Sequence, residues 1–374
     1  MNLLRDLYLR AGLFTAADGT YVRRLDDLFR QLAGKGTDYR FPAVPKESDC
    51  LNVLSLCGIG DALWSAVFIP ALMRKFEKKA VRLLVHYNGD HRSGRSFDLL
   101  KRLSYVRDVV PFRFSIHHPV PVNQEGQYRY MYSAGPAAGA QRRSFDYALI
   151  VNTFLERGWS MEQIAALLDL DSAHLDWSPF SHFEWRDEDS KIADDLAQRW
   201  GDYAVFYLGA DTDNTVAGLN RGGLWRTFDW VSLIKRTHDR TGKKIVIIGA
   251  PYDLSYFKRV FDNGADAVLD ACVNLIGMLD LPETLAVMKK ASFMVGFASG
   301  MPISAAYLRT NTAIFWRPQE LSMSAIWPNH GFHREFATNW VPRDMLESRR
   351  YLDLWYTKDT PEGIVRRMED AKWF

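Results

Sequence analysis

The stretch "LNVLSLCGIGDALW", residues 51–64, decides how this chain is expected to fold. An apolar run enters two close glycines, Gly58 and Gly60, meets one carboxylate, Asp61, and continues into an apolar segment with helical spacing. This order predicts a buried β-strand, a tight turn and an α-helix. A carboxylate at such a turn can cap the helix, bind a nucleotide or take a proton, so the function depends on which of these Asp61 does.

Strand and helix patterns alternate on both sides of this turn. In the first half, strands are predicted over 51–56, 80–87, 106–112 and 145–152, and helices over 62–76 and 96–105. In the second half, strands are predicted over 203–209, 244–249, 266–271, 292–297 and 311–316, and helices over 187–201, 230–242, 254–264, 281–291, 301–310 and 360–374. Pro70 is expected to kink its helix or to start a second piece. The alternation predicts two doubly wound α/β halves, each with a parallel sheet.

Length and composition set the class of protein. The chain has 374 residues, of which 47% are hydrophobic and 25% charged, which is typical of a globular protein with two domains. A formal net charge of +2 argues against a broad nucleic-acid-binding surface. Three scattered cysteines, Cys50, Cys57 and Cys272, indicate a reducing compartment. The N-terminal "MNLLRDLYLRAGLF" lacks the uncharged core of a signal peptide, so a cytoplasmic location is expected.

The pattern divides the chain into four segments. Residues 1–48 are expected to form an N-terminal helical extension, with one amphipathic helix over 21–34. Residues 49–185 and 186–350 are expected to form two Rossmann-like domains that face a central cleft, and residues 351–374 a C-terminal helix. In such sheets ligands bind at the carboxyl ends of the strands, where turns bring backbone N–H groups to phosphate.

Three glycine-containing turns fit this position. "CGIGD" (57–61) ends a predicted strand in the first half, and "IIGAPYD" (247–253) and "GFASGMP" (296–302) end strands in the second. None of them is a GxGxxG fingerprint or a Walker loop, which disfavours a dinucleotide-dependent dehydrogenase or an NTPase.

Three stretches carry a family resemblance. They are "VLSLCGIGDALW", "IVIIGAPYDLSYFKRV" and "NLIGMLDLPETLAVMKKASFMVGFASGMPISAAYL", and in this order and spacing the chain resembles the heptosyltransferase-like glycosyltransferases of family 9 over residues 50–320. That family includes the ADP-heptose:lipopolysaccharide heptosyltransferases and has the GT-B architecture.

The resemblance implies transfer of a sugar from a nucleotide-sugar to an acceptor hydroxyl, with inversion and without a metal or other cofactor. It implies that the first domain binds the acceptor, that the second binds the donor, and that the C-terminal helix packs back across both domains. The catalytic aspartate of the family matches Asp61. An ionised aspartate can take the proton that the attacking hydroxyl loses, whereas a plain helix-start carboxylate is the alternative interpretation.

Further residues are candidates for the two substrates, each with an ordinary turn, cap or solvated loop as its alternative. The candidate donor-binding residues are Arg221, Trp225, Arg226, Gly249, Asp253, Gly277, Met278, Ser299 and Gly300. The helix that starts at Ser299 and Gly300 would hold the diphosphate. The two arginines would bind phosphate bidentately, and Asp253 would bind ribose hydroxyls. The candidate acceptor-binding residues are Gly60, His91, Arg92 and Arg95.

The donor pattern departs from the family in this chain. Ala298 stands where the family often has an acid, Pro302 and Ile303 where it has a histidine, and Gly223 where it has a lysine. These positions would hold the donor's phosphates and sugar. The donor is therefore expected to be ADP-heptose-like or another nucleotide-sugar.

The sequence offers weak candidates for a metal site. Asp211 and Asp213 form a DxD pair after a predicted strand, but turn chemistry explains such a pair well. His330 and His333 lie in "HGFH" without a third ligand in view. No metal is therefore expected to take part.

Two other functions stay open. One is a sugar-nucleotide epimerase-type enzyme, which would change the nucleotide-sugar without an acceptor. The other is a non-catalytic nucleotide-sugar-binding protein. For a transferase, the acceptor is open between a lipopolysaccharide sugar or other glycan, a small glycoside, a protein side chain and a modified nucleic-acid base, the last disfavoured by the small net charge.

Overall fold

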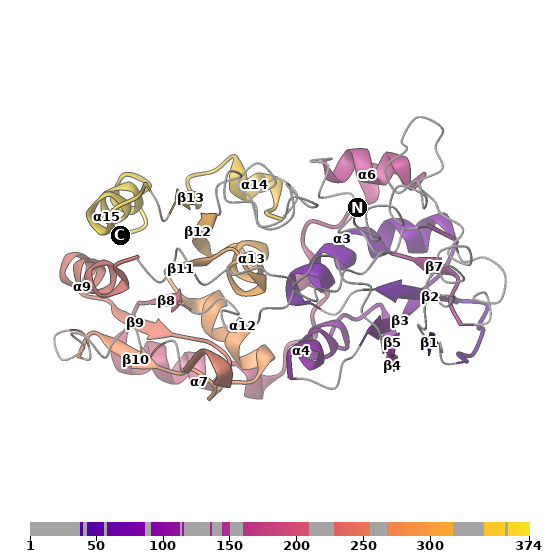
Figure 1. Cartoon of the computed structure of the whole chain (residues 1–374), viewed down its shortest axis with the longest axis horizontal. Helices are drawn as coiled ribbons and strands as arrows, with labels where there is room; N and C mark the ends of the chain where they lie inside the picture. Colours follow the sequence, from indigo (N-terminus) through magenta and orange to yellow (C-terminus); the bar gives the residue numbers. More distant parts are fainter. Residues whose placement is uncertain are drawn as a thin grey trace. The chain divides into compact units, whose positions relative to one another are not determined.

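The computed structural model describes residues 38–39, 43–55, 58–86, 91–112, 114–115, 135–136, 144–149, 160–208, 228–254, 257, 268, 270–316, 340–355 and 358–374. The described residues up to Glu184 form one compact unit, unit 1, and those from Trp185 onward form a second, unit 2 (Figure 1). Each unit has its own sheet of mainly parallel strands, which confirms the predicted α/β fold class. The helix predicted over 21–34 lies outside the described residues.

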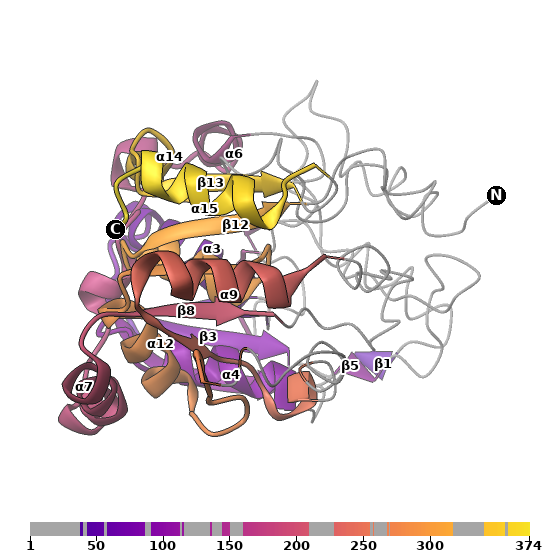
Figure 2. The same ribbon diagram turned by 90° about the vertical axis from the view of Figure 1, so that its left-hand side faces the viewer.

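Unit 1 contains a five-stranded sheet in the order β4-β3-β2-β7-β6. Its strands are β2 (Cys50–Ser55), β3 (Ala80–His86), β4 (Val106–Phe112), β6 (Gly135–Pro136) and β7 (Tyr147–Ala148). Strands β4, β3, β2 and β7 are parallel, and β6 pairs antiparallel with β7. All six residues of β2 are buried, which explains its nearly unbroken apolar sequence. A short antiparallel pair, β1 (Asp38–Tyr39) and β5 (Phe114–Ser115), is separate from this sheet (Figure 2).

The helix that follows β2 is the longest described one in unit 1. The helical segments of the unit are α3 (Ile59–Lys75), α4 (His91–Leu100), α6 (Met161–Leu167), η2 (Ser172–His174) and η3 (Pro179–His182). Pro70 lies inside α3 and does not divide it, contrary to the expectation of a second piece. A proline at this position cannot bond the carbonyl of Ala66, and the Tyr105 hydroxyl approaches that oxygen at 3.5 Å instead. Helix α4 begins at His91 rather than at Ser96.

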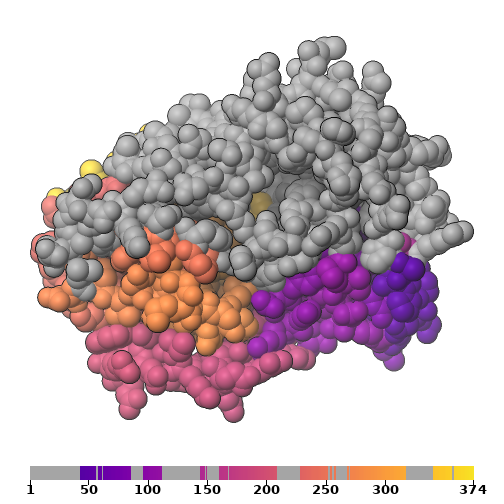
Figure 3. Space-filling view, turned by 60° about the horizontal axis from the view of Figure 1, so that its bottom comes forward, coloured from indigo at the N-terminus to yellow at the C-terminus, as the bar shows by residue number. Residues whose placement is uncertain are grey.

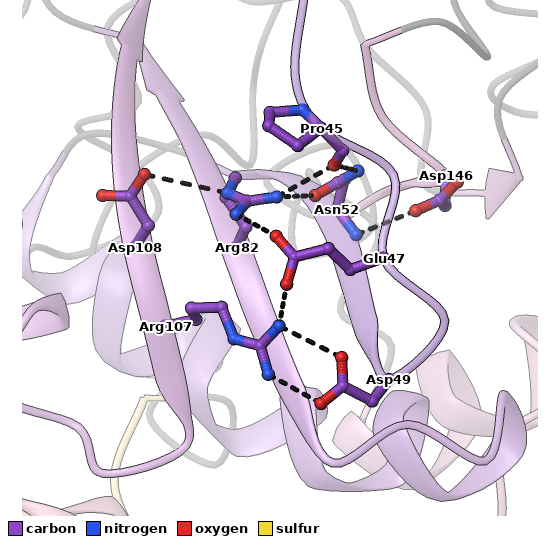
Figure 4. A network of polar contacts seen from close by, with 8 residues as sticks. All are labelled: Pro45, Glu47, Asp49, Asn52, Arg82, Arg107, Asp108 and Asp146. Atoms are coloured by element: carbon purple, nitrogen blue, oxygen red, sulfur yellow. Dashed lines mark hydrogen bonds and ion pairs between the residues drawn. The ribbon is translucent and has the colours of Figure 1, made fainter.

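A polar network joins the strands of unit 1 near their amino ends (Figure 4). Arg82 of β3 is almost fully buried, and its guanidinium donates to Glu47 at 2.6 Å and to the carbonyl of Pro45 at 2.9 Å. Arg107 of β4 donates to Glu47 and, at 2.8 Å, to Asp49. The segment before β2 is thereby tied to the two strands beside it, and the buried guanidinium keeps its charge partners.

Unit 2 contains a six-stranded, fully parallel sheet in the order β10-β9-β8-β11-β12-β13. Its strands are β8 (Tyr203–Tyr207), β9 (Lys244–Ile247), β10 (Cys272–Asn274), β11 (Phe293–Phe297), β12 (Asn311–Trp316) and β13 (Tyr351–Trp355). The central strands β8 and β11 are buried along their whole length, as expected of strands with helices on both faces.

Helices cover both faces of this sheet. The helical segments are α7 (Asp187–Trp200), α9 (Trp230–Thr241), η5 (Pro251–Asp253), α12 (Leu281–Lys290), α13 (Gly300–Tyr307), α14 (Arg343–Leu346) and α15 (Pro361–Asp370). Helices α9 and α15 pack together and share one core with alternate residues of the strands. Helix α12 packs on α7, and Figure 3 shows the outer surface of α7, in rose, beside the orange surface of the α12 region.

Two predicted elements of unit 2 differ from the structure. The strand predicted over 266–271 is wrong: Val268 is helical, and the strand begins at Cys272. Strand β13 was not predicted, and it lies inside the segment 351–374 that was expected to be a C-terminal helix. Helix α15 follows it and contacts α9 and β13. The expectation that this segment also reaches the first domain stays a prediction, as does the division into four segments.

The strand order defines one special point in each sheet. In unit 2, β9 and β10 lie on one side of β8, and β11, β12 and β13 lie on the other. In unit 1, β3 and β4 lie on one side of β2, and β7 lies on the other. The chain therefore reverses its direction of travel across the sheet at β8/β11 and at β2/β7. In open α/β sheets, ligands bind at the carboxyl ends of the strands at such switch points.

Candidate functional site

The switch point of unit 2 is followed directly by the turn "FASG" and helix α13. Gly296 of β11 makes this arrangement possible, because a Cβ there would lie 2.9 Å from Cγ of Pro302 and 3.1 Å from the carbonyl oxygen of Tyr207. Helix α13 and strand β8 therefore approach β11 more closely than a side chain would allow. A glycine within an apolar strand indicates such a close approach. Gly296 is therefore a residue that the sequence could have pointed to but that is absent from the predicted site.

Ser299 is the N-cap residue of α13, and its side chain makes no capping hydrogen bond. The residue is 9% exposed, and its hydroxyl oxygen is buried without a hydrogen-bond partner. The first turn of α13 contains no acidic residue, and the leading N–H groups of a helix, those of Gly300 and Met301 here, have no partner within the helix. The structure thus provides free donors and the positive end of a helix dipole at the switch point, which is the chemistry of an anion-binding site.

The turns after β9 and β10 are bonded to one another. The N–H of Gly277 donates to the carbonyl of Gly249 at 2.8 Å. Gly277 has φ +73°, and a Cβ there would lie 3.0 Å from Cα of Pro251. Two candidate donor-binding glycines therefore belong to one crowded double turn next to the switch point.

Asp253 closes this double turn. Its carboxylate accepts from the backbone N–H of Ala250 at 2.7 Å, and the residue is 3% exposed. A Cβ on Gly249 would lie 2.9 Å from the same carboxylate oxygen, so this position of the aspartate requires a glycine at 249. The role of Asp253 as a ribose ligand stays a prediction, whereas its capping contact is observed. Met278, by contrast, directly follows Gly277 in the chain and is 69% exposed.

The switch point of unit 1 carries Gly60 and Asp61. Helix α3 begins at Ile59 with Gly58 as its N-cap, so Asp61 is the third residue of the helix and not its cap. The first helical hydrogen bond runs from the N–H of Ala62 to the carbonyl of Gly58 at 2.7 Å. Gly60 is buried in this turn. Asp61 is therefore not the N-cap residue, and of the two helix-start alternatives, a cap or a first-turn carboxylate, the structure shows the second.

The other candidate acceptor residues lie on α4. His91, Arg92 and Arg95 occupy the first half of this helix, whereas a solvated loop was the alternative that the sequence left open. The helix follows β3, which is the neighbour of β2 in the sheet. Their role as acceptor ligands stays a prediction.

Several candidates lie outside the described residues. They are Arg221, Trp225 and Arg226 of the donor set, with Gly223, and Asp211, Asp213, His330 and His333 of the metal set. Among the residues that the structure does describe, no group of three or more His, Cys, Asp or Glu side chains could hold a metal ion.

The described cysteines are unsuited to nucleophilic catalysis. Burial raises the pKa of the Cys272 thiol to about 12, and burial also raises the pKa of Cys50. Both thiols are therefore protonated at neutral pH, and the thiolate is the reactive form. The described site depends instead on oxygen and backbone nitrogen groups.

Comparison with known proteins shows the fold. No protein-family model matches the chain, and no curated protein sequence matches it. Among solved structures, a glycosyl transferase of family 9 from Veillonella parvula DSM 2008 matches at 11% identity and a TM-score of 0.53, covering 88% of this chain and 99% of that one. The ADP-heptose lipopolysaccharide heptosyltransferase II of E. coli matches at 13% identity and a TM-score of 0.50, covering 86% and 97%.

These similarities extend over nearly the whole length of both structures. They show that the chain has the GT-B fold of glycosyltransferases, and they confirm at the level of fold the resemblance to family 9 that its motifs indicate. In the part of the chain that the structure describes, no helix has the length and apolar character needed to cross a bilayer.

Proposed function

We propose that this protein is an inverting glycosyltransferase, with unit 2 as the donor-binding domain and unit 1 as the acceptor-binding domain. One observation carries the proposal: the buried, unpartnered hydroxyl of Ser299 at the N-terminus of α13, at the switch point of unit 2. A buried donor without a partner costs about 1–3 kcal/mol and calls for an explanation. A diphosphate oxygen supplies the missing partner and matches the helix dipole.

The reaction follows from the groups at the two switch points. Asp61 takes the proton of the acceptor hydroxyl as its oxygen bonds to the anomeric carbon of the donor sugar. The bond from that carbon to the diphosphate oxygen breaks on the opposite face, so the configuration inverts. The electron pair leaves on the nucleoside diphosphate, whose added charge is stabilised by the N–H groups of α13 and the Ser299 hydroxyl.

The donor is proposed as ADP-heptose or a related nucleotide-sugar. ADP-heptose is the donor in the name of the E. coli structure that shares this fold. Arg221, Trp225, Arg226, Gly249, Asp253, Gly277 and Met278 are proposed to complete the donor site. Because an arginine binds phosphate bidentately, Arg221 and Arg226 would neutralise the charge of the diphosphate.

A thermal-shift screen of nucleotide-sugars tests the donor site, because a ligand that binds the folded state raises the melting temperature. Ser299→Ala should weaken binding of the stabilising nucleotide-sugar by about 2–10-fold, the worth of one hydrogen bond. Ser304→Ala is the matched control, since the hydroxyl of Ser304 is also buried in α13 but donates to the carbonyl of Gly300 at 2.6 Å. Equal affinity in wild type and Ser299→Ala would remove the observation on which the proposal rests.

Product analysis separates the proposal from its rivals. Transfer requires an acceptor and releases the nucleoside diphosphate, whereas an epimerase-type enzyme alters the nucleotide-sugar alone and a binding protein leaves it intact. The proposed mechanism uses no metal, so turnover should survive EDTA. Loss of activity with EDTA and recovery with Mn²⁺ or Mg²⁺ would instead place a metal–diphosphate complex at Asp211 and Asp213.

A further inference from the structure

Two buried tryptophans, Trp64 of α3 and Trp230 of α9, share an unusual feature. They are 3% and 1% exposed, and the indole nitrogen of each is buried without a hydrogen-bond partner. The indole N–H is a donor only, and a buried donor is normally satisfied. The surroundings of the two rings show which of these N–H groups needs a ligand.

The surroundings of Trp230 are aromatic. The indole lies among Phe228, Phe297 and Phe315, with ring centroids 5.2, 5.4 and 5.3 Å away and the planes inclined by 68–74°. Near-perpendicular rings let the N–H edge of the indole face a π-system, which acts as a weak acceptor. Trp230 therefore belongs to an aromatic core that offers ring faces as weak acceptors to the edge of the indole.

The surroundings of Trp64 are different. Its ring neighbour in the described structure is Phe68, one turn further along α3, at 4.3 Å between centroids and 32° between planes. With planes inclined by only 32°, Phe68 does not offer the indole edge a near-perpendicular ring of the kind that surrounds Trp230.

The position of Trp64 points to the substrate that would complete it. Trp64 follows Asp61 by three residues and Gly60 by four, so the three positions lie on one face of α3. Side chains of a helix lean toward its N-terminus, and the N-terminus of α3 lies at the switch point of unit 1. Trp64 thus lies on the same face of α3 as the proposed base, one turn further along the helix.

We infer that Trp64 is an acceptor-binding residue whose indole N–H donates to an oxygen of the acceptor beside the hydroxyl that Asp61 deprotonates. This inference rests on the proposed function. A donor bonded to the attacking oxygen itself would occupy a lone pair and weaken the nucleophile, so the indole is assigned to a neighbouring oxygen. The acceptor is then a compound with two oxygens close together, of the class of sugars and polyols, and a simple alcohol does not satisfy both groups.

The sharpest test replaces Trp64 by 3-benzothienylalanine, in which a sulfur takes the place of the N–H and the ring keeps its shape. The same replacement at Trp230 is the matched control, and Trp64→Phe is a second variant. The acceptor probes are the methyl glycosides of glucose, galactose and mannose, with methanol as the single-hydroxyl comparison, each offered with the nucleotide-sugar that stabilises the wild type.

The expected result is a KM for the glycoside raised by about 2–10-fold in the Trp64 variants, with kcat and the donor KM unchanged, and no such change for the Trp230 variant. The 3-benzothienylalanine variant at position 64 should melt no lower than wild type, because no hydrogen bond of the free protein is lost. An unchanged glycoside KM, a lower melting temperature, or wild-type transfer to methanol as ready as to the glycosides overturns the inference. A wild type that binds no nucleotide-sugar overturns the proposed function, and this inference with it.

Discussion

Unit 1 and unit 2 place a helix N-terminus at the same topological position, but they equip it with opposite chemistry. In unit 1, α3 begins after β2 with a carboxylate, Asp61, in its first turn. In unit 2, α13 begins after β11 with an unpartnered hydroxyl, that of Ser299, and no acid in its first turn. A carboxylate cancels the positive end of the helix dipole and repels anions, whereas free donors attract them. This difference agrees with the proposal that unit 1 binds a neutral hydroxyl compound and unit 2 a diphosphate.

The two units also differ in the interactions that stabilise their sheets. Unit 2 packs an apolar and aromatic core of α9, α15 and the strands, in which Trp230 and Phe315 are fully buried. Unit 1 places a charged residue, Arg82, on its sheet and satisfies it with Glu47, Asn52 and the carbonyl of Pro45. A buried charge tolerates loss of a partner poorly, so unit 1 is expected to respond to pH more than unit 2.

The largest effect is expected for Asp61→Asn. Asparagine keeps the size of the side chain at this first-turn position but cannot take a proton. Transfer should fall by roughly 10²–10⁴-fold, the usual worth of a general base, while donor affinity hardly changes. Loss of the carboxylate from the helix start should lower stability by no more than about 1 kcal/mol. Initial transfer rates and thermal melts of the same preparations check both statements, and a variant that keeps more than about a tenth of the wild-type rate would reduce Asp61 to a helix-start residue.

The next largest effect is expected for Gly296→Ala in the donor unit. The added methyl would meet Cγ of Pro302 at 2.9 Å and the backbone of Tyr207 at 3.1 Å, and the backbone oxygen cannot rotate away. Overpacking should lower the free energy of unfolding by about 1–3 kcal/mol. Relief by a shift of α13 moves the start of that helix, so nucleotide-sugar affinity should fall about tenfold, or about 1.4 kcal/mol. Calorimetric titration measures the affinity. Full affinity in this variant would show that the first turn of α13 does not hold the donor.

A smaller effect is expected for Gly277→Ala, and the chain provides its control. Gly277 and Gly242 have φ of +73° and +68°, so alanine is strained at both by about 1 kcal/mol. Only Gly277 is also crowded, with Pro251 within 3.0 Å of the added Cβ, whereas nothing lies within 4 Å at Gly242. Both variants should lose stability, Gly277→Ala more, and Gly277→Ala alone should weaken donor binding. Equal losses and equal affinities would mean that the double turn is only structural.

Much of this architecture could be predicted from the sequence, because parallel strands with helices on both faces are apolar runs. Strands β2, β8 and β11 are buried along their length, and they are the segments that the pattern located. Strand β13 was missed because it has half-buried residues at its edge position and the mixed sequence "YLDLW". Strand β10 was misplaced because its few residues are only partly buried.

The strand ends that carry the candidate site could be located from the sequence, but the contacts made there could not. The glycine turns mark the strand ends, and the strand order then makes two of them switch points, which no local pattern reveals. That Asp253 closes its own turn, or that the Ser299 hydroxyl lacks a partner, depends on contacts that form only in the folded chain. The same holds for Arg82, whose partners come from segments up to 37 residues away.

The smallest effect is expected on the melting temperature at acid pH. It distinguishes the charged network of the unit 1 sheet from the apolar core of the unit 2 sheet. The hydrogen bond from Arg82 lowers the pKa of Glu47, and that from Arg107 lowers the pKa of Asp49. A carboxylate with a folded-state pKa below its unfolded value of about 4 contributes stability above that value and loses it as pH falls through the folded pKa. The melting temperature should therefore fall when the pH is lowered below about 4. Glu47→Gln should lower the melting temperature at neutral pH and should reduce its fall in acid, each by no more than a few degrees.

Asp239→Asn is the control, because Lys235 lowers the pKa of Asp239 on the exposed face of α9 without a buried partner. Asp239→Asn could reduce the fall of the melting temperature in acid as much as Glu47→Gln does. The buried guanidinium of Arg82 would then contribute no more acid sensitivity than a surface ion pair, and the two units would differ only in the chemistry of their switch points.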